Sequence, residues 1–165
     1  MTFSISQGCA CSHIRDVMLV ASFLWVMYFG TMTHILLVED DLDLREMLMS
    51  ILVDVGHHVI DVGDGKAALA AIRGGQPDLI VSDIIMDGME GIAAIIAFRK
   101  LLPETSIIAM SGNELYLSNS EKLGADLGLL KPYTRATFLS EINALLDASE
   151  RQLLTAGACV RTFIS

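Results

Sequence analysis

The stretch that most constrains the fold is residues 79–83, where the apolar run Leu-Ile-Val is followed by Ser82 and Asp83. A run this short, without alternating polar residues, is typical of a strand buried on both faces of a parallel sheet. Gly88 and Gly91 then mark a loop before the next apolar segment. Asp83 would therefore lie just beyond the carboxyl end of a strand, where open α/β sheets bind their ligands. The alternative for an isolated aspartate is that it only caps the loop.

Short apolar runs alternate with segments of helical periodicity along the chain. The pattern predicts strands at residues 34–41, 57–62, 78–83, 106–112 and 127–132. It predicts helices at residues 42–55, 66–73, 91–102, 114–123 and 138–146. The crossovers are long enough to join parallel neighbours. We therefore expect one α/β domain at residues 33–149, a doubly wound sheet of five parallel strands with helices on both faces.

Polar residues follow four of the predicted strands: Glu39, Asp40 and Asp41, then Asp83, Ser111 and Lys131. The carboxyl ends of parallel strands lie on one edge of a sheet, so these side chains can converge. Clustered carboxylates repel one another unless a cation lies among them, and their hard oxygens favour Mg²⁺. The set suits phosphoryl transfer onto Asp83, with Lys131 as the positive charge and Ser111 as a hydroxyl donor.

Each of these residues also has a simpler structural explanation. Ser111 and Gly112 could form an ordinary turn, and Lys131 could be a surface residue before Pro132. Residues 39–41 could cap the following helix, since acids are favoured at helix N-termini. Any one of these residues could lie at a strand end by chance. It is much less expected that all of them do so in one parallel sheet.

The charge of the chain limits its partners. The formal net charge is −9, and residues 33–149 contain 18 acidic and 8 basic residues. Nucleic-acid surfaces need clustered Lys and Arg, so the sequence argues against one. The acidity suits a cation site, although solubility explains it equally well. Cys9, Cys11 and Cys159 lie outside the predicted domain and lack zinc-site spacing, which predicts reduced thiols in a cytoplasmic protein.

The terminal segments differ from the predicted domain. Residues 17–29 form an apolar run broken only by Ser22, shorter than the about 20 residues of a membrane span. A span continued to Val38 would take the first strand out of the sheet. Nor does the segment match a signal peptide. Residues 1–32 are predicted to be a disordered extension or an artefact of a start at Met32, with a membrane anchor or surface helix as the alternative. Residues 150–165 are predicted to be a loose tail.

An ordered set of motifs makes residues 34–148 resemble the receiver domain of two-component response regulators. They are ILLVEDD, DLIVSD, a Met- and Gly-containing loop, IIAMSG, LGAD and LLKP. The resemblance implies a flavodoxin-like fold. It implies these site roles: Asp83 as phospho-acceptor, Glu39 and Asp40 as the acidic pair for Mg²⁺, Ile85 as a backbone-carbonyl metal ligand, Ser111 as switch hydroxyl and Lys131 as phosphoryl contact. It also implies a cis bond between Lys131 and Pro132.

Three positions depart from the family pattern that this resemblance implies. Asp87 stands where the family usually has proline, which adds charge to the loop. Gly128 stands where the family commonly has an aromatic residue, so an aromatic rotamer switch is unavailable there. Ile85 is apolar, and we predict that it hinders an attacking water and lengthens the lifetime of the phosphoryl group.

The leading functional hypothesis is a stand-alone receiver that takes a phosphoryl group from a histidine kinase or phosphotransfer protein and signals through a changed protein surface. It would be a phospho-acceptor with self-phosphorylation and self-dephosphorylation chemistry rather than an enzyme. One alternative is a pseudo-receiver adaptor that works without phosphorylation. A haloacid dehalogenase-type phosphatase would need a second aspartate at Ile85. A dinucleotide-binding module would need G-x-G-x-x-G after the first strand.

Overall fold

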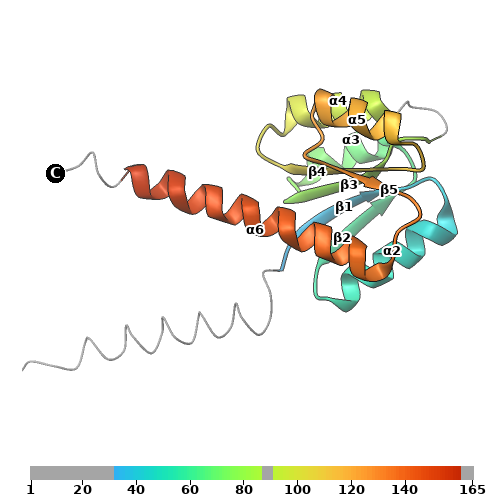
Figure 1. The fold of residues 1–165 in the computed structure, drawn as a ribbon, viewed down its shortest axis with the longest axis horizontal. Coiled ribbons are helices and arrows are strands. Elements are labelled where there is room, and N and C mark those ends of the chain that lie inside the picture. Colours follow the sequence, from blue (N-terminus) through green and yellow to red (C-terminus); the bar gives the residue numbers. More distant parts are fainter. Residues whose placement is uncertain (1–31, 87–90, 161–165) are drawn as a thin grey trace, which may run out of the picture. The chain divides into compact units, whose positions relative to one another are not determined.

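The computed structural model describes residues 32–86 and 91–160 (Figure 1). At its centre is a parallel sheet of five strands in the order β2-β1-β3-β4-β5. The strands are β1 (His34–Val38), β2 (His58–Val62), β3 (Leu79–Asp83), β4 (Ser106–Ser111) and β5 (Leu127–Leu130). β3, which ends at Asp83, lies between β1 and β4. This strand order is that of the flavodoxin-like fold, so the predicted fold class is confirmed.

Helices cover both faces of the sheet. Those within the described residues are α2 (Leu42–Asp54), α3 (Gly65–Gly74), α4 (Gly91–Leu101), α5 (Glu114–Leu123) and α6 (Arg135–Val160). Figure 1 shows α2 and α6 on one face and α3, α4 and α5 on the other, and the two hydrophobic clusters divide in the same way. The sheet and its helices belong to one compact unit that begins at Thr33.

The two cores are built from alternate residues of the same strands. In β1, Ile35 and Leu37 pack in the cluster of α2 and α6, whereas Leu36 and Val38 pack in the cluster of α3, α4 and α5. Successive side chains of a strand point to opposite faces, which is why one apolar run supplies both cores. Every residue of β3 and β4 is buried, as their apolar composition predicted. β3 and β4, which end at Asp83 and Ser111, are therefore packed on both faces.

Polar caps fix where three helices begin. The Asp41 carboxylate accepts a hydrogen bond from the Leu44 N–H at 2.9 Å, at the start of α2. Asp64 accepts from two N–H groups at the start of α3, and Asn113 accepts from one at the start of α5. These side chains satisfy N–H groups that have no partner within their own helix. All three caps follow the carboxyl ends of strands, so they also shape the loops around the site.

The structure differs from the sequence prediction at several element ends. β1 ends at Val38, so Glu39 and Asp40 lie in a loop and not in the strand. β4 and β5 likewise end one and two residues earlier than predicted. α6 continues to Val160, so the loose tail predicted from residue 150 is wrong for residues 150–160. A helix can continue without apolar periodicity where residues favour helix by propensity, as in this Ala- and Leu-containing stretch.

Some sequence predictions fall on residues that the structure leaves undescribed. The apolar segment at residues 17–29 and the Asp87 position lie outside the described residues, as do residues 161–165. Within the described ranges, no helix is both long enough and apolar enough to cross a bilayer.

Candidate functional site

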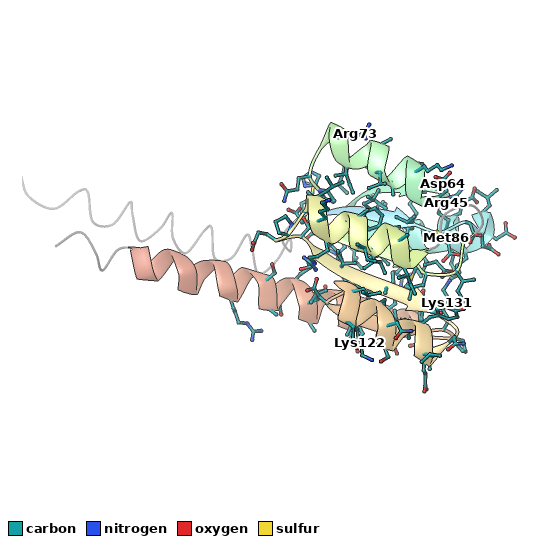
Figure 2. All side chains as sticks on the ribbon, turned by 90° about the horizontal axis from the view of Figure 1, so that it is seen from above. Arg45, Asp64, Arg73, Met86, Lys122 and Lys131 are labelled. Carbon is teal, nitrogen blue, oxygen red and sulfur yellow. The ribbon has the colours of Figure 1, made fainter. Side chains whose placement is uncertain are left out.

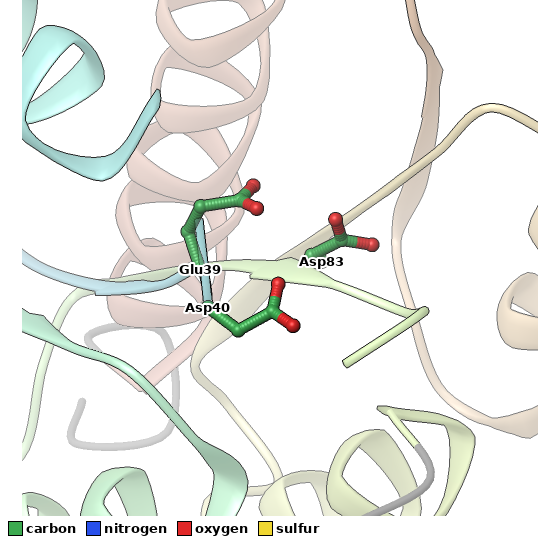
Figure 3. A group of neighbouring side chains, drawn as sticks. All are labelled: Glu39, Asp40 and Asp83. Atoms are coloured by element: carbon green, nitrogen blue, oxygen red, sulfur yellow. The ribbon is translucent and has the colours of Figure 1, made fainter. Parts of the chain in front are cut away.

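The carboxyl edge of the sheet brings together the acidic residues predicted from the sequence. Glu39 and Asp40 lie in the loop between β1 and α2, and Asp83 is the last residue of β3. One carboxylate oxygen from each lies within 4.8 Å of the others, and Figure 3 shows the three carboxyl groups around one small space. Glu39 and Asp83 are buried, at 1% and 7% exposure, whereas Asp40 is exposed. This set offers a divalent cation one open side and a cluster of hard oxygen ligands.

Lys131 supplies the positive charge of the site. Its Nζ donates to Asp83 Oδ2 at 2.6 Å and to Glu39 Oε2 at 2.8 Å. Its side chain is 22% exposed, so this ion pair is largely shielded from water. Buried charges persist when they are paired and hydrogen-bonded, and here one ammonium pairs with two carboxylates. The peptide bond between Lys131 and Pro132 is cis, as predicted.

The pKa values of Glu39 and Lys131 are set by burial and by the charges around them. Burial raises the pKa of Glu39, and the charge of Asp83 adds to this, while Lys131 opposes it without cancelling it. Burial alone would lower the pKa of Lys131, but its hydrogen bonds to Asp83 and Glu39 and their charges outweigh burial and raise that pKa. Lys131 is thus held as a cation. The three carboxylates still exceed the one ammonium in charge, and this excess negative charge favours binding of a metal ion.

The two oxygens of Asp83 have different partners. Oδ2 accepts from Lys131, and Oδ1 accepts from the Ile85 N–H at 2.8 Å. Ile85 itself is 55% exposed. The backbone of Ile85 therefore reaches Asp83 through its N–H, while the metal-ligand role of the Ile85 carbonyl stays a prediction.

Ser111 lies at the end of β4 and is fully buried. Its Oγ accepts a hydrogen bond from the Asn113 N–H at 3.2 Å, which supports the turn that its simpler explanation predicted. The Ser111 carbonyl accepts from the Lys131 N–H at 2.8 Å, so the serine also anchors the backbone of the lysine. Its role as switch hydroxyl stays a prediction.

Two further residues at this edge were not singled out from the sequence. Arg45 of α2 donates from Nη1 to the Glu39 carbonyl at 2.7 Å. Tyr133 stacks on Phe138 with 5.5 Å between ring centroids, and its hydroxyl contacts Met110 Sδ at 2.9 Å. Burial raises the pKa of Tyr133, and the charges of Glu39 and Asp83 add to the effect. Their sequence signals, an arginine in the first helix and an aromatic after Pro132, are too common to point to a site by themselves.

The Gly128 position is closed by helix α5. The Gly128 N–H donates to Glu121 Oε1 at 3.1 Å, and a Cβ at this glycine would lie 2.9 Å from that oxygen and 3.0 Å from Leu117 Cβ. A side chain here would require Glu121 to turn away and Leu117 to shift slightly. The departure noted in the sequence therefore has a structural counterpart in how closely α5 packs on β5.

Comparisons with known proteins identify relatives of this chain. The family model described as "Response regulator receiver domain" matches residues 35–143. The transcription factor SKN7 of Candida albicans is 33% identical over 126 residues, covering 72% of this chain and 22% of SKN7. The DNA-binding response regulator MtrA of Mycolicibacterium smegmatis is 32% identical over 119 residues, covering 71% of this chain and 52% of MtrA. The chain thus spans about half or less of the length of these curated relatives.

A solved structure matches over nearly its whole length. The CheY-like response regulator receiver domain protein of Methanospirillum hungatei superposes with a TM-score of 0.71 at 27% identity. The match covers 74% of this chain and 99% of that protein. The similarity therefore extends over a complete receiver domain.

Proposed function

Because this chain belongs to the response regulator receiver domain family, we propose that it is a signalling phospho-acceptor whose acceptor residue is Asp83. The observation that carries the proposal is the contact of Lys131 Nζ with both Asp83 and Glu39, at 2.6 and 2.8 Å. It joins the carboxyl ends of β1, β3 and β5 in one buried charge cluster. A cluster of this kind costs stability in a domain that needs only to fold, which favours a chemical role.

The proposed reaction is transfer of a phosphoryl group from a phosphohistidine. An Asp83 oxygen attacks phosphorus, a P–O bond forms, and the P–N bond breaks with its electron pair returning to the imidazole of the donor. The product is an acyl phosphate on Asp83. Lys131 would offset the negative charge that gathers on the phosphoryl oxygens, and the buried Ser111 hydroxyl is proposed to donate to one of them.

Glu39, Asp40 and Asp83 are proposed to hold Mg²⁺, with the Ile85 carbonyl as a further ligand. The donor set fits this ion because three carboxylates within 4.8 Å carry more negative charge than Lys131 neutralises. When bound, Mg²⁺ would supply charge neutralisation and orient a phosphoryl oxygen. Glu39 and Asp40 would present their oxygens to the ion beside Asp83.

We propose that the phosphoryl donor is a histidine kinase or a histidine phosphotransfer protein, in the cytoplasm. The chain would pass on its signal through a changed protein–protein surface. We propose that it acts on no separate substrate, so that its chemistry is confined to gaining and losing its own phosphoryl group.

The test is the intact mass of the full chain after incubation with acetyl phosphate, with and without Mg²⁺. We expect one phosphoryl group to be added, only with Mg²⁺ and only while Asp83 is present. Asp83→Asn keeps the shape but removes the nucleophile and should stay unmodified. Asp147→Asn is the matched control, since that exposed residue pairs with Arg151 one helical turn away.

Two results would count against the proposal. Modification of Asp83→Asn at the wild-type rate would place the acceptor elsewhere. A folded wild-type chain that binds Mg²⁺ but gains no phosphoryl group, from acetyl phosphate or from a phosphorylated kinase, would favour the adaptor alternative.

A further inference from the structure

Arg45 links the acidic loop to the neighbouring strand. It lies in the first turns of α2, and its Nη1 donates to the Glu39 carbonyl at 2.7 Å. Its Nε donates to Asp61 Oδ2 in β2 at 3.2 Å. The Arg45 side chain is only 17% exposed, and Figure 2 shows it at the same end of the sheet as Lys131. A planar guanidinium can bind two acceptors in fixed directions, so this contact defines a geometry as well as a charge.

Gly63 leaves space for the Arg45 guanidinium, because glycine has no side chain. A Cβ at Gly63, just after β2, would lie 3.0 Å from Arg45 Nη1, so a larger residue there would crowd the guanidinium. The Glu39 N–H donates to the Val62 carbonyl at 3.1 Å. Both backbone polar groups of Glu39 are therefore held, the N–H by the end of β2 and the carbonyl by Arg45. This fixes the loop from which the Glu39 and Asp40 side chains extend.

We propose that Arg45 is a positioning residue for the metal-binding carboxylates, acting through the backbone of Glu39. The inference rests on the proposed function, because it assigns Arg45 a role toward the Mg²⁺ site named there. Arg45 donates to the Glu39 carbonyl and to Asp61, so these hydrogen bonds do not use the carboxylate oxygens proposed to bind the ion. Partners of this outer kind commonly change metal affinity by about 10–100-fold when they are lost.

The two physical effects of Arg45 predict opposite results when it is removed. As a nearby positive charge, it repels Mg²⁺, so a purely electrostatic role predicts tighter binding without it. As the clamp on the Glu39 carbonyl, it preorganises two ligands, so a positioning role predicts weaker binding without it. The sign of the change in Mg²⁺ affinity therefore separates the two.

The experiment measures the Mg²⁺ dissociation constant of the full chain by titration calorimetry, together with thermal unfolding. We expect Arg45→Met to raise the dissociation constant about ten-fold or more. Arg45→Lys keeps the charge but cannot hold both acceptors, so we expect a smaller rise in the same direction. Arg135→Met is the matched control, because Arg135 forms an exposed pair with Asp54 at 3.3 Å and should leave affinity unchanged.

A second readout separates positioning from loss of folding. In the acetyl phosphate reaction, the Mg²⁺ concentration for half-maximal rate should rise in the Arg45 variants, while the rate at saturating Mg²⁺ should remain near the wild-type rate. Unchanged or tighter Mg²⁺ binding by Arg45→Met overturns the proposal. If that variant does not fold, Arg45→Lys decides, because it keeps the charge: a raised dissociation constant supports positioning, and an unchanged one overturns the proposal. A wild-type chain that binds no Mg²⁺ would instead refute the metal part of the proposed function.

Discussion

At the scale of single residues, the site is a balance between one ammonium and several carboxylates. Lys131 holds Glu39 and Asp83, yet the pKa of Glu39 is still raised because burial outweighs the help from Lys131. A raised carboxyl pKa means that the folded state resists the ionised form. Folding therefore bears a cost at neutral pH for keeping Glu39 charged and available to a cation.

Replacing Glu39 by glutamine should reveal that cost. Glu39→Gln keeps the shape and an oxygen that can accept from Lys131, but it removes the buried charge. Without Mg²⁺, we expect the melting temperature at pH 7.5 to rise by a few degrees, since about 1 kcal/mol corresponds to about 4–8 °C in a small domain. The stabilisation by added Mg²⁺ should be largely lost. Differential scanning calorimetry with and without Mg²⁺ measures both effects.

The pH dependence of that difference has a definite sign. A folded-state pKa above the unfolded value gives a contribution that favours folding below the unfolded pKa of about 4.5 and is lost as pH rises through the folded pKa. The advantage of Glu39→Gln should therefore shrink as pH is lowered from 7.5 toward 4.5. Glu104→Gln, at an exposed loop position, is the control and should show no such trend. An advantage that grows on acidification would contradict this account of Glu39.

Ile85 should govern how long the phosphoryl group persists. The Ile85 N–H donates to Asp83 Oδ1 at 2.8 Å, and Ile85 is apolar and exposed, so we propose that it hinders water from attacking a phosphoryl group on Asp83. We expect Ile85→Asn to lose the phosphoryl group several-fold faster, because an amide can hold and orient water. The measurement is the decay of the phosphorylated mass after acetyl phosphate is removed. Ile85→Val is the apolar control, and equal lifetimes for all three chains would refute the role of Ile85.

At the scale of elements, the close approach of α4 to the end of β3 depends on a glycine. The Gly91 N–H donates to the Ile84 carbonyl at 3.1 Å, and a Cβ at Gly91 would overlap the Ile84 backbone. We expect Gly91→Ala to lower the free energy of unfolding by about 1–3 kcal/mol, as overpacking does. Gly74→Ala, in α3 with open space around it, should raise that free energy by about 0.4–1 kcal/mol. Urea denaturation measures both, and similar values for the two variants would contradict the packing argument.

The elements were predictable where a local pattern decides them. The runs at residues 79–81 and 107–110 are apolar throughout and lie in the buried strands β3 and β4. Element ends were less predictable, because a strand ends where its neighbours stop pairing, which the sequence of one strand does not contain. The length of α6 was missed for a related reason: the helix propensity of residues 150–160 continues after the apolar periodicity has ended.

At the scale of the whole molecule, the strand order decides which residues can meet. Because β3 lies beside β1 and β4, and β5 lies next to β4, residues far apart in sequence share one edge. The acidic cluster was predictable, since any parallel arrangement puts strand ends together. The Arg45 clamp was not, because it requires the pairing of β1 with β2 and the space left by Gly63. Pairwise side-chain geometry of this kind appears only in the folded structure.

The bridge from Lys131 to Glu39 and Asp83 has a consequence for the environment in which the protein can work. Mobile ions screen exposed charges such as the Arg135–Asp54 pair, whose side chains are 53% and 55% exposed. Mobile ions screen the Lys131 pairs much less, because the side chains of Glu39 and Asp83 are only 2% and 10% exposed. The resting arrangement of the site is therefore insulated from changes in ionic strength. The two ion pairs of Lys131 should therefore persist at salt concentrations that weaken the exposed Arg135–Asp54 pair.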